Sequence, residues 1–171
     1  MNNTARIPEF PALQEEFRHV MSAVCTPVAV VTATGHRMPY GTTVSAFASL
    51  SMTPPMVLVS LDKGSELLSV ITTTGKFGLN VLGTDQAELA LNFARKGGTS
   101  KFTGIAWEPH AEVPKLPGAT GFVACTVAEI IEGGDHFVVL GDVVAAHRYD
   151  SKPLTYHGRM FGTHISLADV Q

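Results

Sequence analysis

The sequence predicts a mainly β protein, an antiparallel β-barrel with a few peripheral helices. Short β-branched segments dominate the chain, and two long β segments at 119–131 and 136–148 are joined by the turn sequence EGGD. The helical segments fall between hairpins, without the regular strand–helix alternation of a parallel sheet. The 171 residues are 45% hydrophobic and 16% charged. We therefore expect a single domain over 1–171 with a full core, and no disordered chain.

The first third of the chain predicts one helix followed by strands. Five apolar residues share one helical face over 12–25: Leu13, Phe17, Val20, Met21 and Val24. We expect a strand at 28–34 (VAVVTAT), a loop or hairpin turn at 35–41, and a further strand over 41–53. The sequence MVLVSL at 56–61 is apolar at nearly every position, which predicts a strand buried on both faces.

Two further helices are expected, each with a recognisable start. Ser65 is placed to cap a helix over 66–74, and Gly75 is placed to end it. Thr84 is placed to cap a helix that runs through residue 93.

The remaining segments are one strand and several loops. KFGLNVL at 76–82 predicts a strand, and the glycine-rich segment 94–104 predicts a loop. The tail at 151–162 is expected to be loop with one last strand.

Composition excludes several classes of partner. The net charge of −3 leaves no basic face for nucleic acid or an anionic membrane. No apolar run approaches the roughly 18 residues that span a bilayer, and the first ten residues lack the pattern of a secretory signal. Cys25 and Cys125 stand in apolar contexts, which predicts two buried free thiols and a cytoplasmic location.

The familiar motifs of enzymes are missing from the chain. It has no G-x-G-x-x-G, no H-E-x-x-H and no G-x-S-x-G, and TTTGKF does not complete a P-loop. Seven scattered histidines and no cysteine pair indicate no metal site. We expect that a bound cofactor carries the chemistry.

The segment 41–53 is unusually rich in hydroxyl groups. Six of its thirteen residues carry one: Thr42, Thr43, Ser45, Ser49, Ser51 and Thr53. Hydroxyls beside backbone N–H groups can bind a phosphate or the heteroatoms of a heterocycle, although an exposed strand face also tolerates Ser and Thr. The pair Pro54-Pro55 removes two ladder donors directly afterwards, which favours the edge of a site.

Several motifs together resemble a known family. They are VAVVTA, TTVSAFASLSMTPPMVLVSL, FARKGGTSKF, PGATGFVACTV, GGDHFVVLGDV and PLTYHGRMFG. In this combination the chain resembles the short-chain flavin reductases, the reductase components of two-component flavin-dependent monooxygenases. The resemblance covers about residues 17–162.

The resemblance implies a fold, a reaction and partners. It implies an FMN-binding split barrel that forms a homodimer and binds FMN or FAD. It implies hydride transfer from NADH or NADPH to the flavin, after which the reduced flavin diffuses to a partner monooxygenase. Two alternatives remain: an oxidase of the pyridoxamine-phosphate-oxidase type, which shares the barrel, and a flavin-binding protein without enzymatic activity.

The resemblance also implies site residues. The isoalloxazine ring would lie along Thr43, Val44, Ser45 and Ala46. The ribityl chain and phosphate would lie near Ser60 and the turn from Asp62 to Ser65. The basic–aromatic pair Lys101 and Phe102 would lie beside the phosphate or adenosine, and His136 would position the nicotinamide.

Several other residues have an expected role that is structural, or that is an alternative to one given above. Arg95 and Lys96 are alternatives to Lys101 as phosphate ligands, and His136 could be an ordinary turn residue. The side chain of Asp135 is expected to shape the hairpin. For the last three residues of interest, Trp107 is expected in the core or at its rim, and Tyr156 and Arg159 could cover the site or the dimer edge.

Overall fold

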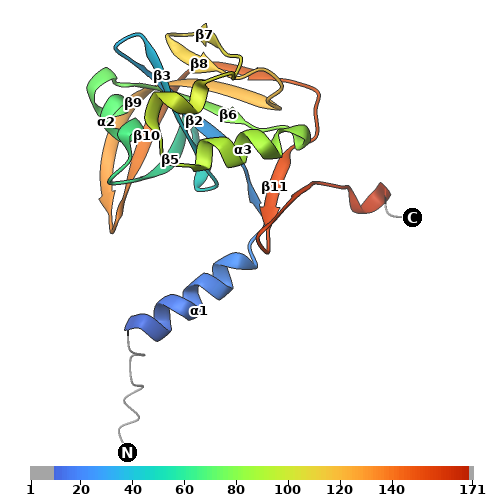
Figure 1. The fold of residues 1–171 in the computed structure, drawn as a ribbon. Helices are drawn as coiled ribbons and strands as arrows, with labels where there is room; N and C mark the ends of the chain where they lie inside the picture. The colour runs from blue at the N-terminus through green and yellow to red at the C-terminus, as the bar shows by residue number, and fades with distance from the viewer. Residues whose placement is uncertain (1–9, 170–171) are drawn as a thin grey trace, which may run out of the picture.

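A seven-stranded antiparallel sheet forms the body of the molecule (Figure 1). The computed structural model describes residues 10–169, so the expectation for the first ten residues lies almost wholly outside it. In order across the sheet the strands are β3 (Met38–Val44), β2 (Ala29–Gly35), β6 (Lys76–Val81), β9 (Gly121–Gly133), β10 (His136–Arg148), β5 (Pro55–Asp62) and β4 (Phe47–Met52). All neighbouring pairs are antiparallel, which confirms the predicted fold class.

The two edge strands of this sheet are joined to each other by only two residues. β3 and β4 lie at opposite ends of the strand order, yet Ser45 and Ala46 alone separate them along the chain. Since Val44 and Phe47 are three residues apart and so at most about 11 Å from each other, the sheet must curl until its two edge strands come close. The amide of Ser60 donates to the carbonyl of Ala46 at 2.9 Å and fixes this connection to β5. The result is a curled sheet that stays open along one seam, between β3 and β4, as in a split barrel.

Helix α2 (Glu66–Thr74) has the predicted bounds and covers one face of the sheet. Its apolar side buries Leu67, Leu68 and Ile71, each worth about 1.5–3 kcal/mol of burial. Gly75 ends the helix in the left-handed conformation, with φ of 68°, and donates to the carbonyl of Ile71. Ser65 occupies the N-cap position, but its hydroxyl makes no capping hydrogen bond.

Helix α3 (Ala87–Ala94) covers the other face, after a 3₁₀ turn at Thr84–Gln86. The helical prediction for 84–93 is confirmed, but the predicted cap is wrong. The side chain of Gln86 accepts a hydrogen bond from the Gly83 amide at 2.9 Å, so glutamine and not Thr84 satisfies the first donor. A second 3₁₀ turn, η2 (Gly98–Phe102), interrupts the predicted loop 94–104.

Strand β2, and not β5, is the strand buried on both faces. Six of the seven residues of β2 are buried, because α2 and α3 both contact this strand. In β5 only Val57, Val59 and Leu61 are buried, in strict alternation. The prediction for 56–61 was therefore wrong, because an apolar run does not reveal whether a second layer covers it.

The hairpins are predicted well except around the seam. The strands predicted at 119–131 and 136–148 are confirmed with ends shifted by at most two residues. The single strand predicted over 41–53 is wrong, because the chain leaves β3 at Val44 and starts β4 at Phe47. The turn expected at 35–41 occupies only His36 and Arg37, with φ of 49° and 64°.

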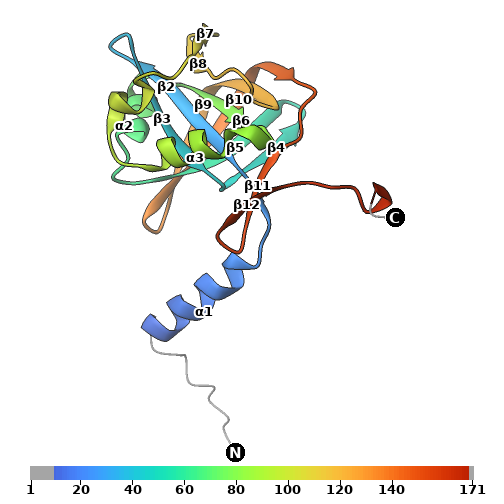
Figure 2. The ribbon, with the colours of Figure 1, turned by 45° about the vertical axis from the view of Figure 1, so that its right-hand side comes forward.

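Helix α1 (Phe10–Ser22) leads away from the body of the molecule (Figures 1 and 2). A helix was predicted here, but its apolar side chains do not pack on the sheet. They are 44–63% exposed: Leu13, Phe17, Val20, Met21 and, just beyond the helix, Val24. Cys25 follows the helix and is exposed, so its predicted burial is wrong, whereas Cys125 in β9 is buried as predicted.

Short strands complete the fold. β1 (Thr26–Pro27), β11 (Leu154–His157) and β12 (Met160–Thr163) form a small sheet at the base of α1, so the tail holds two strands where one was expected. β7 (Glu108–His110) and β8 (Val113–Lys115) form a hairpin, and Leu167–Asp169 is a last 3₁₀ turn.

Candidate functional site

A cavity of about 250 Å³ opens at the seam of the barrel. We call it the seam cavity, and its lining residues come from β3, the connection to β4, β5, the following turn and β10: Thr42, Thr43, Val44, Ser45, Ala46, Ser60, Leu61, Asp62, Ser65 and His136. Eight of the ten predicted site residues are in this set. The fold therefore brings together segments that are more than 90 residues apart in the sequence.

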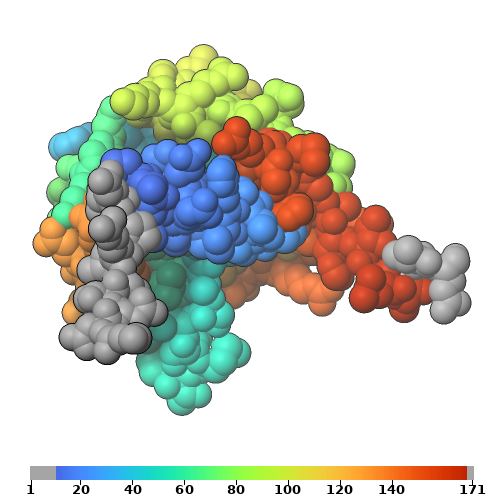
Figure 3. Space-filling model, turned by 90° about the horizontal axis from the view of Figure 1, so that it is seen from below, coloured from blue at the N-terminus to red at the C-terminus, as the bar shows by residue number. Residues whose placement is uncertain are grey.

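The hydroxyl-rich stretch serves this cavity only in its first half. Thr43 donates its hydroxyl to the carbonyl of Ala90 at 2.7 Å, which ties β3 to α3. Past the seam, the hydroxyls at positions 49, 51 and 53 lie on the β4–β5 hairpin, the teal lobe that stands out in Figure 3. Ser51 there accepts a hydrogen bond from the Thr53 amide, so the second half is an ordinary polar hairpin.

The turn after β5 is held by its own aspartate. The carboxylate of Asp62 accepts a hydrogen bond from the Gly64 amide at 2.7 Å, and its carbonyl accepts one from the Ser65 amide at 3.0 Å. This carboxylate therefore shapes the turn. Contact with a phosphate would be unfavourable, because both groups are negatively charged. Ser65 has its hydroxyl at the N-terminus of α2, where backbone N–H groups favour an anion.

His136 lies at the start of β10, directly opposite Asp62 in the β5–β10 ladder. Its Nδ1 is 2.7 Å from a carboxylate oxygen of Asp135. The hydrogen bond to His136, followed by the charge of its imidazole, lowers the pKa of Asp135. Asp135 was expected to shape the hairpin through its side chain. It instead orients the imidazole, so that Nε2 is the nitrogen available to a ligand.

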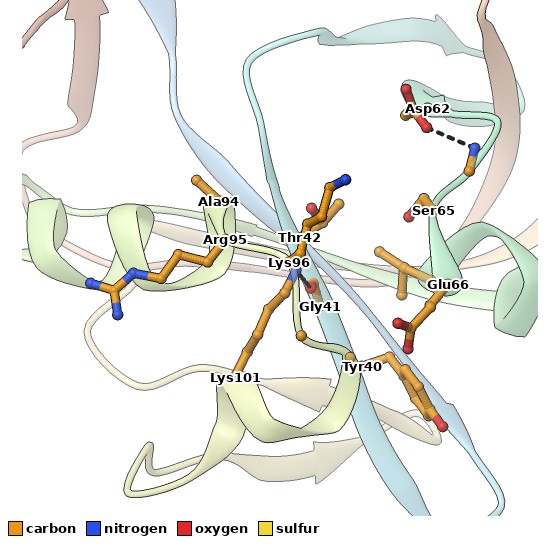
Figure 4. A pocket seen from close by; sticks show the side chains of 14 residues that line it. Tyr40, Gly41, Thr42, Asp62, Ser65, Glu66, Ala94, Arg95, Lys96 and Lys101 are labelled. Atoms are coloured by element: carbon orange, nitrogen blue, oxygen red, sulfur yellow. Dashed lines mark hydrogen bonds between the residues drawn. The ribbon is translucent and has the colours of Figure 1, made fainter.

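A second cavity of about 430 Å³ continues from the first and shares Thr42, Asp62 and Ser65 with it. We call it the basic cavity, because the segment after α3 contributes three cations to its lining: Arg95, Lys96 and Lys101. In Figure 4 this segment lies on one side and the turn with Ser65 on the other. The side chain of Lys96 rises past Thr42 between them, whereas Arg95 points away from Ser65.

Lys101 is engaged within the protein. Its ammonium donates to the carbonyls of Gly41 and Phe93, both at 3.1 Å. Burial lowers the pKa of Lys101, and the nearby charge of Glu66 partly opposes this. Lys101 therefore pins its loop against β3. Arg95 and Lys96 form no ion pair among the described residues, so they carry the available charge.

Phe102 belongs to the core and lines none of these cavities. It is 7% exposed, and its ring packs edge-on against Phe93 with centroids 4.8 Å apart. Trp107 packs against Phe102 at 6.2 Å, as expected for a residue at the rim of the core. Lys101 and Phe102 thus both anchor this loop to the rest of the protein, and the ring of Phe102 does not enter the site.

Tyr156 and Arg159 are remote from the seam. Tyr156 packs on Phe161 within the small sheet at the base of α1, and neither residue lines the seam or basic cavity. Sequence reasoning missed Tyr40 and Glu66, which do line the basic cavity. The two-residue period along β3 places Tyr40 and Thr42 on one face and could have identified the tyrosine.

The two cavities suit a flavin with a phosphate. The seam cavity offers hydroxyls and main-chain groups for the polar rim of a heterocycle. The basic cavity adds Lys96, and the unengaged hydroxyl of Ser65 stands at a helix N-terminus. Within residues 10–169 no group of three or more His, Cys, Asp or Glu side chains could hold a metal ion.

Comparison with known proteins identifies the family. Residues 21–164 match the model of the flavin reductase like domain. The chain is 38% identical to the reductase component of a 4-nitrophenol 4-monooxygenase/4-nitrocatechol 2-monooxygenase from Rhodococcus opacus, over 89% of this chain and 82% of that one. It is also 38% identical to the FMN reductase (NADH) SmoA of Agrobacterium fabrum, over 85% of this chain and 83% of that one.

A solved structure agrees with this assignment. The NADH:FAD oxidoreductase SgcE6 of Streptomyces globisporus, in complex with NAD and FAD fragments, superposes with a TM-score of 0.86 at 29% identity. The match covers 96% of this chain and all of that one. On the fold, the seam cavity and these likenesses together, the chain belongs to the flavin reductase family.

Proposed function

We propose that the protein is a flavin reductase that transfers hydride from NADH or NADPH to FMN or FAD and supplies reduced flavin to a monooxygenase. The observation that carries this proposal is the convergence of eight expected residues on one cavity at the barrel seam. The related reductases from R. opacus and A. fabrum support the same reaction and the same type of partner.

The residues of this chain would bind and orient the reactants. Ser45 and Ala46 would face the flavin ring, and Ser60 would lie near its ribityl chain. Ser65 with Lys96 would hold the phosphate. His136, held by Asp135, would support the nicotinamide beside the ring. When bound, the flavin supplies the electrophilic nitrogen that accepts the hydride, and no protein base is required for that transfer.

The anaerobic reaction with NADH tests the proposal. Purified protein mixed with FMN, FAD or riboflavin should lose the oxidised flavin absorbance within seconds of NADH addition, with no other substrate. An oxidase of the pyridoxamine-phosphate-oxidase type would keep its flavin oxidised until its own substrate is added. A binding protein without activity would bind flavin and never reduce it. Repetition with NADPH separates the two nicotinamides.

A homodimer is part of the same proposal. The apolar face of α1 is exposed, and a 13-residue helix is marginal in water without packing. A second copy of the chain would cover this face and is expected from the resemblance to the family. Light scattering at micromolar concentration should give twice the mass of the chain, and Phe17→Glu should give a monomer.

The place of the reaction follows from the proposed partner. A reductase that passes flavin by diffusion must share a compartment with its oxygenase, and the free thiols suit the reducing cytoplasm. No helix among the described residues is long and apolar enough to cross a membrane.

A further inference from the structure

Two of the seven histidines meet at the surface of the molecule. His110 ends strand β7, and His147 lies near the end of β10, 37 residues later in the chain. Their Nε2 atoms are 3.0 Å apart, and the planes of the two rings stand at 84° to each other. The pair lines neither the seam cavity nor the basic cavity, so the proposed flavin reaction makes no use of it.

The ring of Phe122 holds both imidazoles in place. Phe122 stands directly opposite His147 in the β9–β10 ladder, and the two rings lie nearly parallel, at 18° with centroids 6.5 Å apart. The ring of His110 packs edge-on against Phe122, with centroids 5.5 Å apart. Phe122 itself has no exposed surface. Because a buried side chain fixes both rings, little rotamer freedom is lost when one ligand binds to both nitrogen atoms.

The separation of the two nitrogen atoms suits neighbouring positions around a metal ion. Two ligands at right angles, each about 2.0–2.1 Å from a first-row metal, lie roughly 2.8–3.0 Å apart. A tetrahedral ion at the same bond length would hold them roughly 3.3–3.4 Å apart. The observed 3.0 Å therefore favours an octahedral or square-planar ion, such as Ni²⁺ or Cu²⁺, over tetrahedral Zn²⁺.

The charges around the pair do not oppose a cation. Glu108 and Glu112 stand two residues before and after His110, and each is engaged in an ion pair with a lysine, so these charges cancel. Arg148 follows His147 but projects to the other face of β10, because side chains alternate along a strand. The pair is exposed, so water can fill the remaining coordination positions of a bound ion.

We propose that His110 and His147 form a binding site for a divalent first-row metal ion that takes its ligands at right angles. Each imidazole donates the lone pair of Nε2 to the metal and carries its proton on Nδ1. In the hydrogen bond between the rings one Nε2 carries the proton, so this ring changes its tautomer on binding and no net proton is released. The metal joins the β7–β8 hairpin to β10 and stabilises the folded chain.

Calorimetric titration with Ni²⁺ tests the site. The untagged protein is used with Cys25→Ser, so that neither added histidines nor the exposed thiol bind the metal. One Ni²⁺ should bind per chain. Loss of an outer partner of a metal ligand costs about 10–100-fold in affinity, so loss of a ligand in His110→Gln or His147→Gln should weaken Ni²⁺ at least tenfold. His36→Asn is the control and should change nothing, because this exposed histidine lies in the β2–β3 turn.

The requirement for both nitrogen atoms on one ion is the sharpest part of the test. The double variant of His110 and His147 should bind Ni²⁺ little more weakly than either single variant, since each single change already breaks the chelate. Electron paramagnetic resonance of bound Cu²⁺ should show two imidazole nitrogens in the parent protein and one in each single variant. Ni²⁺ at a hundredfold excess over its Kd should raise the unfolding midpoint by about 5–10 °C in the parent protein alone.

The opposite results would overturn the proposal. If either single variant keeps the affinity of the parent protein, or if Cu²⁺ shows only one nitrogen ligand there, the two histidines form a hydrogen bond and no metal site. Unfolding of each variant without metal shows that the fold is intact. Flavin reduction plays no part in these measurements, so the metal site and the proposed function stand or fall separately.

Discussion

The ammonium group of Lys101 lies 3.1 Å from the carbonyl oxygen of Gly41, which is 60 residues earlier in the chain. A second bond of equal length joins the same group to Phe93 at the end of α3. Gly41 permits this approach, since a Cβ at this position would lie 2.9 Å from the ring of Phe93. The loop that carries the cations of the basic cavity is thus anchored to the strand that forms the cavity's floor.

Replacement of Lys101 should therefore loosen the loop. We expect Lys101→Met to lower the free energy of unfolding by about 1–2 kcal/mol, because two charged hydrogen bonds are lost from a partly hydrated group. Urea unfolding measures this change. FMN and riboflavin should lose similar affinity, since the lysine acts through the loop. If the variant keeps its stability and loses affinity for FMN but not for riboflavin, Lys101 contacts the phosphate directly and this prediction is wrong.

Lys96 is the residue expected to distinguish FMN from riboflavin. Its charge lies in the basic cavity and is not paired within the described residues. Lys96→Ala should weaken FMN by about tenfold, the value of one charged hydrogen bond, and leave riboflavin within twofold. Fluorescence titration of both flavins measures the difference, with Lys152→Ala as a control that lines neither the seam cavity nor the basic cavity. Equal effects on both ligands would show that Lys96 does not contact a phosphate.

His136 is expected to serve the nicotinamide. His136→Ala should lower kcat/KM for NADH by roughly ten- to a hundredfold and change flavin affinity only a few-fold, because alignment and not proton transfer is lost. Asp135→Asn should give a smaller loss, since it removes only the group that orients the imidazole. Anaerobic stopped-flow reduction measures both variants. A collapse of flavin binding in His136→Ala would place the histidine on the flavin instead.

Among the buried polar residues of the core, Asn80 is the one whose replacement we expect to destabilise the fold most. Its amide donates to the carbonyls of Val30 and Pro114 and accepts from the amide of Leu116 at 2.8 Å, with no exposed surface. Asn80→Ala leaves the amide of Leu116 without its acceptor, although Thr32 still donates to the Pro114 carbonyl at 2.6 Å, and it should destabilise the fold by about 2–4 kcal/mol. Asn92→Ala is the comparison, because Asn92 makes one bond at a half-buried position. Similar unfolding midpoints for the two variants would contradict the prediction.

The two thiols should differ sharply in behaviour. Burial, followed by the charge of Asp142, raises the pKa of Cys125 to about 12 from 9.0. A thiol with a raised pKa contributes stability that is complete below pH 9 and is lost as the pH rises toward 12. Cys125→Ala should therefore flatten this part of the stability profile. A thiol reagent at neutral pH should modify Cys25 at once and Cys125 only on unfolding. The folded protein should therefore react rapidly with one equivalent of reagent.

Local patterns predicted much of the fold correctly. The helix at 66–74 and the long hairpin around EGGD were predicted well because their signals are confined to a few neighbouring residues. Burial was predicted less well. The wrong predictions for Cys25 and for 56–61 both assumed a covering layer, and which layer covers a segment depends on residues far away in the sequence.

The candidate site was predicted through its motifs, but the roles within it were not. Asp62 lines both cavities, as expected, but its carboxylate also holds its own turn, and the carboxylate of Asp135, which was expected to shape the hairpin, binds His136. Both aspartates stand in turns, where the sequence does not show which donor comes within reach. The role of Lys101 was also hidden, because its two acceptors are main-chain carbonyls that carry no side-chain signal.

The two-residue connection of Ser45 and Ala46 ties the shape of the site to the shape of the whole protein. Most enzymes of the β class can vary a binding loop while the scaffold stays constant. Here the binding loop cannot vary alone, because the same two residues join the two edge strands of the sheet and form a wall of the seam cavity. We expect that lengthening it by a single residue would let the two edge strands separate and would displace one wall of the seam cavity. We therefore expect ligand preference in this architecture to change through the loop after α3, whose cations line the basic cavity without belonging to the sheet.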